Sequence, residues 1–256
     1  MPKFIPKGYQ KRFIEIFDRL CRSRQPWQVW SDFVTMSATA ISNSVNADQA
    51  DTRERRYQEI VSGYQPVERK LFPHLVAETV NALEKNPAQD YLGDLYMGLG
   101  LGNHWRGQFF TPYHLCQAMA EISLQDAYEQ ICRNEWISIL DPACGAGATL
   151  IAAANTLLGK GVNYQERALF VGQDIDPIVA MMCYIQLSLL GCPGYVAIGN
   201  SLTTPLTGHP LFPVSREGLD IWITPVLYTE KWLFRSILAD SKSGLTWDIL
   251  PDACRK

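Results

Sequence analysis

The chain has 256 residues, of which 47% are hydrophobic, so it can bury a sizeable core in one or two domains. No apolar run approaches the roughly 20 residues that a helix needs to cross a bilayer, and Met1–Gln10 has lysines but no apolar signal core; we therefore expect a globular, cytoplasmic protein. The seven cysteines are an odd number without any C-x-x-C pair, which argues against a disulfide framework and a zinc site.

The net charge of −3 is unevenly distributed along the chain. Between Lys3 and Arg24, seven basic residues accompany only two acidic ones. Such a local excess is typical of a surface that contacts phosphates, and it is equally typical of a solvated helix face. The sequence leaves both interpretations open.

The first hundred residues show no strand-like alternation and carry apolar residues at helical spacing. One such set is Phe13, Ile16, Phe17 and Leu20. We expect four or five helices, which form a helical N-terminal domain over residues 1–103. The second predicted domain covers residues 104–256.

The second half of the chain alternates between strand and helix patterns. After a helix predicted over residues 112–132, with Thr111 as its N-cap and Pro112 in its first position, strands are predicted at 137–140, 168–174, 195–198 and 219–224. Helices are predicted at 146–158 and 177–190. This alternation predicts an α/β fold, a doubly wound and mostly parallel sheet that binds a ligand at the carboxyl ends of its strands.

Few elements are predicted beyond the fourth strand. Residues 203–218 contain three prolines and two glycines and are expected to form a loop. A helix near 230–238 and a short strand at 245–249 complete the pattern.

The segment ISILDPACGAGATL at 137–150 is the centre of the predicted ligand site. It reads as a strand, a glycine turn and a helix, and Gly145 and Gly147 let the backbone approach a ligand closely. Asp141 ends the strand before the glycines, whereas the dinucleotide fingerprint places its glycines directly after the strand. This order favours a different adenosine cofactor.

Four motifs carry a resemblance to a known family. GQFFTP at 107–112, DPACGAG at 141–147, GQDIDP at 172–177 and GNSL at 199–202 resemble, in that order, the motifs of the N-6 adenine DNA methyltransferases. The resemblance is to the modification subunits of type I restriction systems and their relatives on mobile elements, and it covers roughly residues 90–228. It implies S-adenosylmethionine as cofactor and a Rossmann-like methyltransferase domain over residues 104–256, preceded by the helical domain.

The resemblance also implies which residues bind the cofactor. The glycine turn would lie against its methionine part, Asp141 would hold the ammonium group, and Asp174 would accept the ribose hydroxyls. Ile175 would pack on the adenine and Asn200 would contact the adenine edge. The full set is Phe109, Thr111, Asp141, Ala143, Gly145, Gly147, Asp174, Ile175 and Asn200.

The sequence departs from the family at the catalytic motif. Active members carry Asn or Asp, then Pro-Pro and an aromatic residue, after the fourth strand, and these groups orient the amino group of a flipped adenine. This chain has no Asn-Pro-Pro, and the corresponding text is DIWITPVLY at 220–228. Thr224, Pro225 and Tyr228 are the candidate catalytic residues, as a degenerate form of the motif.

The interpretation that follows is a DNA methyltransferase-family protein for N-6 adenine methylation. The alternative is a non-catalytic cofactor-binding or scaffold subunit that pairs with an active methyltransferase, and a third candidate is methylation of RNA or a small molecule. A full methyltransferase sheet has seven strands and only 32 residues follow Thr224, so the resemblance implies a sheet that is shortened at its C-terminus. No segment is left for a target-recognition domain, so sequence-specific reading of DNA would need a partner chain or an unusual use of the helical domain. Expected partners are DNA, contacted weakly or through another chain, and a specificity subunit, an active subunit or a second copy. No membrane partner is expected.

Overall fold

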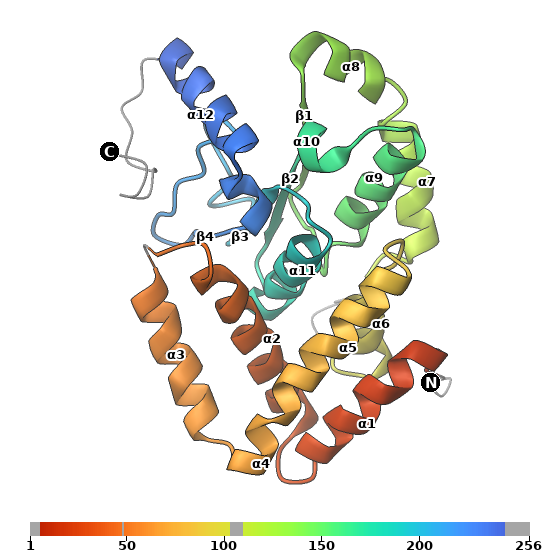
Figure 1. The fold of residues 1–256 in the computed structure, drawn as a ribbon, viewed down its shortest axis with the longest axis vertical. Helices are drawn as coiled ribbons and strands as arrows, with labels where there is room; N and C mark the ends of the chain where they lie inside the picture. Colours follow the sequence, from red (N-terminus) through yellow and green to blue (C-terminus); the bar gives the residue numbers. More distant parts are fainter. Residues whose placement is uncertain (1–5, 48, 103–109, 244–256) are drawn as a thin grey trace.

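The computed structural model describes residues 6–47, 49–102 and 110–243. In the view of Figure 1, the N-terminal helices, coloured red to yellow, occupy the lower half of the molecule, and the sheet with its helices occupies the upper half.

The N-terminal half is helical, as predicted. A short 3-10 helix, η1 (Gly8–Gln10), leads into α1 (Lys11–Leu20) and α2 (Pro26–Asn43). These are followed by α3 (Ala50–Ser62), α4 (Pro66–Arg69), α5 (Leu71–Lys85) and α6 (Tyr91–Gly98). Pro26 and Pro66 each occupy the first turn of a helix, where proline removes no hydrogen bond.

The single helix predicted over residues 112–132 is wrong. The chain instead forms α7 (Tyr113–Ser123) and α8 (Ala127–Asn134), separated at Leu124, which has φ −107° and ψ 24°. Thr111 is not the N-cap, because Pro112 holds that position with an extended ψ of 135° and no side chain caps the helix. The predicted start was therefore one residue too early.

The sheet contains four strands among the described residues, in the order β1-β2-β3-β4. They are β1 (Ile137–Asp141), β2 (Ala168–Asp174), β3 (Gly194–Ile198) and β4 (Asp220–Ile223). The first three are parallel, whereas β4 pairs with β3 in the antiparallel direction. The prediction of a mostly parallel α/β sheet is confirmed, and the last strand is the exception to it.

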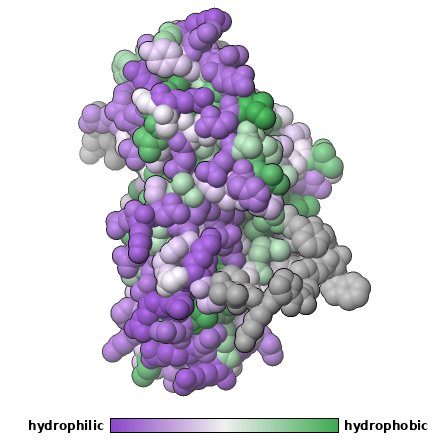
Figure 2. Space-filling model, turned by 90° about the vertical axis from the view of Figure 1, so that its right-hand side faces the viewer, coloured by the Kyte–Doolittle hydropathy of each residue, from purple (hydrophilic) through white to green (hydrophobic). Residues whose placement is uncertain are grey.

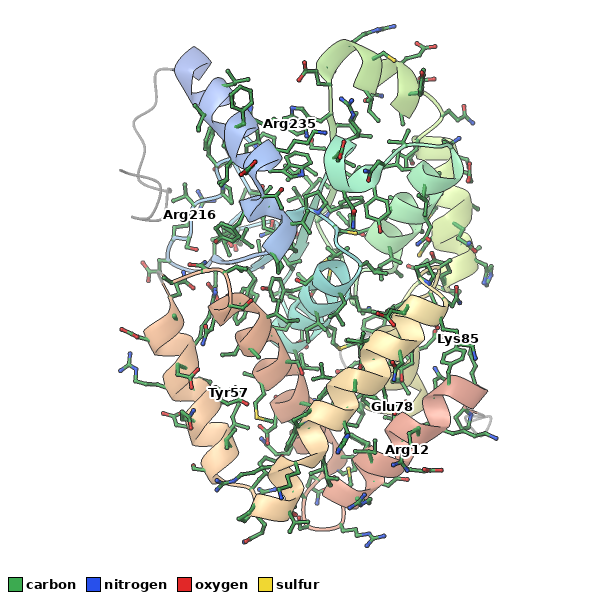
Figure 3. The ribbon with its side chains drawn as sticks, in the orientation of Figure 1. Arg12, Tyr57, Glu78, Lys85, Arg216 and Arg235 are labelled. Atoms are coloured by element: carbon green, nitrogen blue, oxygen red, sulfur yellow. The ribbon has the colours of Figure 1, made fainter. Side chains whose placement is uncertain are left out.

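Helices α9 (Ala148–Gly159), α10 (Tyr164–Arg167) and α11 (Pro177–Leu189) connect the parallel strands. Both faces of β2 are buried, because its residues alternate between two hydrophobic clusters: Phe170 belongs to the larger one, and Leu169 and Val171 to the smaller. After η3 (Pro225–Tyr228), helix α12 (Glu230–Ser243) covers the smaller cluster with the buried Trp232. Arg235 of α12 donates to the carbonyl of Glu166 at 2.6 Å (Figure 3).

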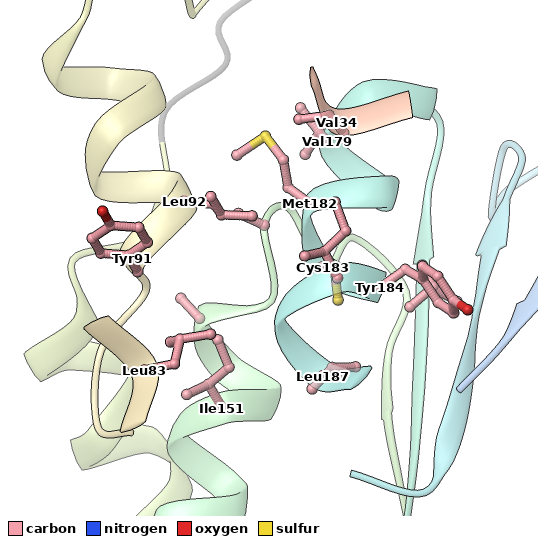
Figure 4. Close-up of a cluster of buried hydrophobic side chains, with 14 of the residues drawn as sticks. Val34, Leu83, Tyr91, Leu92, Ile151, Val179, Met182, Cys183, Tyr184 and Leu187 are labelled. Carbon is pink, nitrogen blue, oxygen red and sulfur yellow. The ribbon is translucent and has the colours of Figure 1, made fainter. Parts of the chain in front are cut away.

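The larger cluster joins the two halves of the chain. Val34 of α2, Leu92 of α6 and Met182 of α11 pack in it together (Figure 4). The indole Nε1 of Trp30 in α2 lies 3.4 Å from the sulfur of Met182. Residues from both sides of the predicted domain boundary at residue 103 thus share one hydrophobic core. The division into two domains remains a prediction.

Arg53 of α3 fixes the position of β4. Its guanidinium lies 3.8 Å from the centre of the Trp222 ring and donates to the carbonyl of Ile221 at 3.1 Å. It also forms an ion pair with Asp220 at 3.6 Å. The side chain of Arg53 is buried, so a residue of the helical half holds three consecutive residues of β4.

Hydrophilic residues predominate on the face of the molecule in Figure 2, with apolar residues scattered among them. Within the described part of the chain, no helix is both long and apolar enough to cross a membrane.

Candidate cofactor-binding site

We define the carboxyl end of the sheet as the end at which β1, β2 and β3 finish. The glycine turn of residues 142–147 lies there, between β1 and α9. Gly147 has φ 101°, and a Cβ atom on it would lie 2.8 Å from the sulfur of Cys183. Only glycine combines that backbone conformation with so close a neighbour.

Asp141, the last residue of β1, holds this turn in place through hydrogen bonds. One carboxylate oxygen accepts a hydrogen bond from the backbone N–H of Ala143 at 3.0 Å, and the other accepts one from the hydroxyl of Thr149. The carboxylate therefore links the end of the strand to the first turn of α9. Its negative charge stays partly exposed beside the turn.

Asp174, at the end of β2, reaches the same turn. Oδ2 accepts from the N–H of Gly145 at 2.9 Å, and Oδ1 accepts from the N–H of Asp176 at 2.9 Å. Burial raises the pKa of Asp174, while these hydrogen bonds oppose that rise. The predicted ribose acceptor and the predicted glycine turn are thus in direct contact, although they are far apart in the sequence.

A cavity of about 230 Å³ opens against the turn. Its lining includes Thr111, Asp141, Ala143 and Gly145, all of which were predicted, and also Asp90 and Phe110. Gly147, the last residue of the turn, is not part of this lining and packs on Cys183. Phe109 lies outside the described residues.

Two further predicted residues border a second, wider hollow of about 800 Å³ at the ends of β2 and β3, and Asp174 lines neither space. Ile175 and Asn200 line the hollow together with Asp220. The Ile175 side chain is 66% exposed, so it offers an apolar surface to a ring. The side-chain oxygen of Asn200 accepts from the N–H of Leu202 at 2.9 Å, which leaves its amide nitrogen as the available donor.

The three candidate catalytic residues lie at the opposite end of the sheet. Because β4 is antiparallel, Ile223 pairs with Tyr195 near the start of β3, and Thr224 follows it there. The Thr224 hydroxyl is buried, accepts from the N–H of Gly194 at 2.9 Å and donates to the carbonyl of Cys192 at 2.7 Å. The structure does not bring Thr224, Pro225 and Tyr228 together with the predicted cofactor residues, so their catalytic role stays a prediction that the geometry does not support.

Sequence reasoning missed Asp90 and Gln186. Asp90 precedes α6, where its Oδ1 caps the helix by accepting from the N–H of Gly93 at 2.9 Å. The amide of Gln186 in α11 donates to the same carboxylate at 2.8 Å and to the carbonyl of Ala146 at 2.9 Å. An aspartate before a helix reads as an ordinary cap, so only its burial distinguishes it.

The model of the N-6 DNA methylase family matches residues 88–248, which is more than half of the chain. The chain belongs to the N-6 DNA methylase family. Membership of this family implies S-adenosylmethionine as the cofactor.

Two curated proteins are similar to part of this chain. The type II restriction enzyme and methyltransferase RM.BcgI of Heyndrickxia coagulans is 38% identical over 98 residues, which are 36% of this chain and 14% of that protein. The type I restriction enzyme MjaIX methylase subunit of Methanocaldococcus jannaschii is 28% identical over 95 residues, 37% of this chain and 15% of that protein. The matched region thus spans about a seventh of the length of each relative.

Among solved structures, a crystal structure from Listeria monocytogenes described as a class I S-adenosylmethionine-dependent methyltransferase aligns with 88% of this chain and 70% of its own. The TM-score is 0.40 and the sequence identity is 16%.

The cavity fits the methionine part of the cofactor in its chemistry. That part carries an ammonium, a carboxylate and a sulfonium, and so a net positive charge. The described lining includes the carboxylates of Asp90 and Asp141 but no lysine, arginine or histidine. A site lined by anions in this way favours a cationic group. The cofactor supplies the methyl group when it is bound.

Proposed function

We propose that the chain binds S-adenosylmethionine across the carboxyl end of the sheet, as a cofactor-binding subunit for DNA methylation. The observation that carries the proposal is the contact between Asp174 and Gly145 of the glycine turn. Gly145 lines the cavity, and Ile175, which follows Asp174, lines the wider hollow. A ligand with a cationic head and an adenosine tail has a matching surface at each end.

The residues take the following roles in this proposal. Asp141, Ala143 and Gly145 border the methionine part, and Thr111 lines the same cavity. The carboxylate of Asp174, now bound to two backbone N–H groups, accepts the ribose hydroxyls. Ile175 packs on the adenine, and the Asn200 amide donates to its edge.

Methyl transfer is a separate question, because it needs acceptors that orient the target amino group. The only candidates offered by the sequence are at the amino end of the sheet, where the Thr224 hydroxyl already bonds to β3. We therefore propose that the isolated chain transfers methyl groups to adenine very slowly or not at all. It would act beside an active methyltransferase or a specificity subunit that supplies the base-orienting groups and the contact with DNA.

The test of binding is calorimetric titration with S-adenosylmethionine and with its demethylated product, S-adenosylhomocysteine. Asp174→Ala should weaken both, by up to roughly 150-fold for each hydrogen bond to the charged group that is lost. Asp18→Ala, which removes an exposed carboxylate on α1, is the matched control and should leave both affinities unchanged. Absence of heat with the unmutated protein would refute the proposal.

The test of activity is incorporation of labelled methyl groups into unmethylated DNA by the purified chain. Turnover near the ordinary enzymatic rate of about 10 per second would contradict the proposal that the isolated chain is inactive. It would also mean that base-orienting groups are present at the carboxyl end of the sheet. Activity that appears only when a second methyltransferase chain is added would support the role of a partner.

A further inference from the structure

Asp90 places a buried negative charge at the cavity. Its side chain is 4% exposed, and it comes from the segment before α6, outside the sheet and its connecting helices. Burial raises its pKa to about 6, against the hydrogen bonds from Gln186 and Gly93 that lower it. The protein thus keeps a poorly solvated carboxylate at a wall of the proposed cofactor site.

Asp90 lines the cavity, and the hydrogen bonds found among the described residues hold only one oxygen of its carboxylate. Both donors, Gln186 and Gly93, bind Oδ1, and no donor among the described residues binds Oδ2. Gln186 is itself fully buried, and its own oxygen accepts from the N–H of Leu92 at 3.0 Å. The orientation of the carboxylate is therefore fixed before any ligand arrives.

The same glutamine connects Asp90 to the glycine turn. Its amide nitrogen donates to Asp90 and to the carbonyl of Ala146, at 2.8 and 2.9 Å. Asp90, Ala146 and Gln186 come from three segments that are distant in the sequence, and the network fixes their relative positions. A ligand that contacts the turn therefore lies within the reach of a carboxylate from the helical half.

We propose that Asp90 is the anchor for the ammonium group of the methionine part of the cofactor. This inference rests on the proposed function and assigns a new residue to that site. A cation that donates hydrogen bonds suits this position, because no hydrogen bond to Oδ2 is found among the described residues and the described cavity lining carries two carboxylates and no basic side chain. A buried, preoriented carboxylate is a strong acceptor for such a group, since water screens the pair little.

Asp141 is the competing carboxylate, and its geometry is less suited to this role. Each of its oxygens already accepts one hydrogen bond, from Ala143 or Thr149, so neither keeps the full acceptor capacity of Oδ2 of Asp90, and Asp141 is less buried than Asp90. It adds negative potential to the cavity, while its bonds maintain the turn. The direct contact is assigned to Asp90.

The experiment compares ligands that differ in one group. S-Adenosylhomocysteine and its analogue without the amino group are titrated into the unmutated protein and into Asp90→Asn, with 5′-methylthioadenosine, which lacks the whole amino acid part, as a third ligand. The unmutated protein should prefer S-adenosylhomocysteine to the deaminated analogue by roughly 10- to 150-fold, the range for one hydrogen bond to a charged group. In Asp90→Asn this preference should disappear, and the affinity for 5′-methylthioadenosine should not change.

Asp90→Ser repeats the test with a second good helix cap, in case asparagine disturbs the fold. Asp94→Asn is the matched control, because Asp94 lies on the same helix, pairs with Lys7 and does not line the cavity. Equal loss for all three ligands in Asp90→Asn would show a purely structural role and overturn the inference. Loss of the preference in Asp141→Asn, with its retention in Asp90→Asn, would overturn it in favour of Asp141. Failure of the unmutated protein to bind any of these ligands would instead refute the proposed function itself.

Discussion

The two ends of the sheet hold residues that look alike in the sequence and differ in the structure. At the carboxyl end, Asp141 and Asp174 converge on one glycine turn beside a cavity. At the amino end, Thr224 also follows a strand, yet it is buried and bonded to the backbone of β3. A polar residue after a strand reaches the ligand-binding end only when that strand runs parallel to its neighbours.

This comparison separates two kinds of effect. Changes at the cofactor site should alter ligand binding, and changes at the amino end should alter stability alone. Each of the following predictions tests that separation or refines it.

Gly147→Ala is expected to have the largest effect, because it should reduce both stability and cofactor affinity. The positive φ costs about 1–2 kcal/mol for a residue with a Cβ atom, and the contact with Cys183 at 2.8 Å adds overpacking of about 1–3 kcal/mol. Thermal unfolding should move to lower temperature, and cofactor affinity should fall because the turn is displaced. Gly147→Ala with Cys183→Ala should recover only the packing part of the stability. Gly159→Ala, where a Cβ atom would meet nothing within 4 Å, is the control.

Asp90→Asn should stabilise the free protein at high pH. The pKa of Asp90 is raised from 3.8 to about 6, and each unit corresponds to about 1.4 kcal/mol, so the charge costs on the order of 3 kcal/mol above pH 6. Because the folded-state pKa is the higher one, the protonated group stabilises the fold fully below pH 4, and that contribution is lost as the pH rises to 6. Urea unfolding of both proteins near pH 4 and pH 8 measures the difference. A difference independent of pH would contradict this account of Asp90.

Thr224→Val should reduce stability and leave cofactor binding unchanged. Loss of the hydroxyl leaves the N–H of Gly194 and the carbonyl of Cys192 without a partner, at a cost of about 1–3 kcal/mol. Thr229→Val, which changes an exposed threonine, should cost less. Chemical denaturation measures the first effect and calorimetry with S-adenosylhomocysteine the second. If Thr224→Val weakened cofactor binding and left stability unchanged, the amino end of the sheet would also affect the ligand, and the distinction between the two ends of the sheet would be wrong.

The smallest effect on stability is expected from the basic residues of the N-terminal segment, which bear on DNA. Lys7 and Arg12 are engaged in ion pairs with Asp94 and Glu15, whereas no ion pair is found among the described residues for a second set, Lys11, Arg19 and Arg22. Neutralising that second set should change stability by no more than about 0.5 kcal/mol. If this surface contacts phosphates, the slope of log affinity against log salt should flatten by about 0.9 per lost contact. An unchanged slope would place any DNA contact elsewhere.

The local sequence determined the elements around the site. The second strand was predicted at 168–174 and is found there, and helix α11 differs from its prediction by one residue. Short-range features define these elements: apolar periodicity, the proline at the start of α11, and the glycines of the turn. The order of the motifs also identified the family, because each motif combines a strand end with the residue type that the cofactor chemistry requires.

Only the tertiary structure decided the direction of β4 and the burial of Asp90. The segment 219–224 has the same strand pattern in either direction, and its antiparallel pairing accompanies contacts with Arg53, which is distant in the sequence. Asp90 has the local sequence of a surface helix cap, and it becomes a buried charge because Gln186 and the glycine turn pack against it. Strand direction and desolvation depend on contacts between distant segments, and a local pattern carries no information about them.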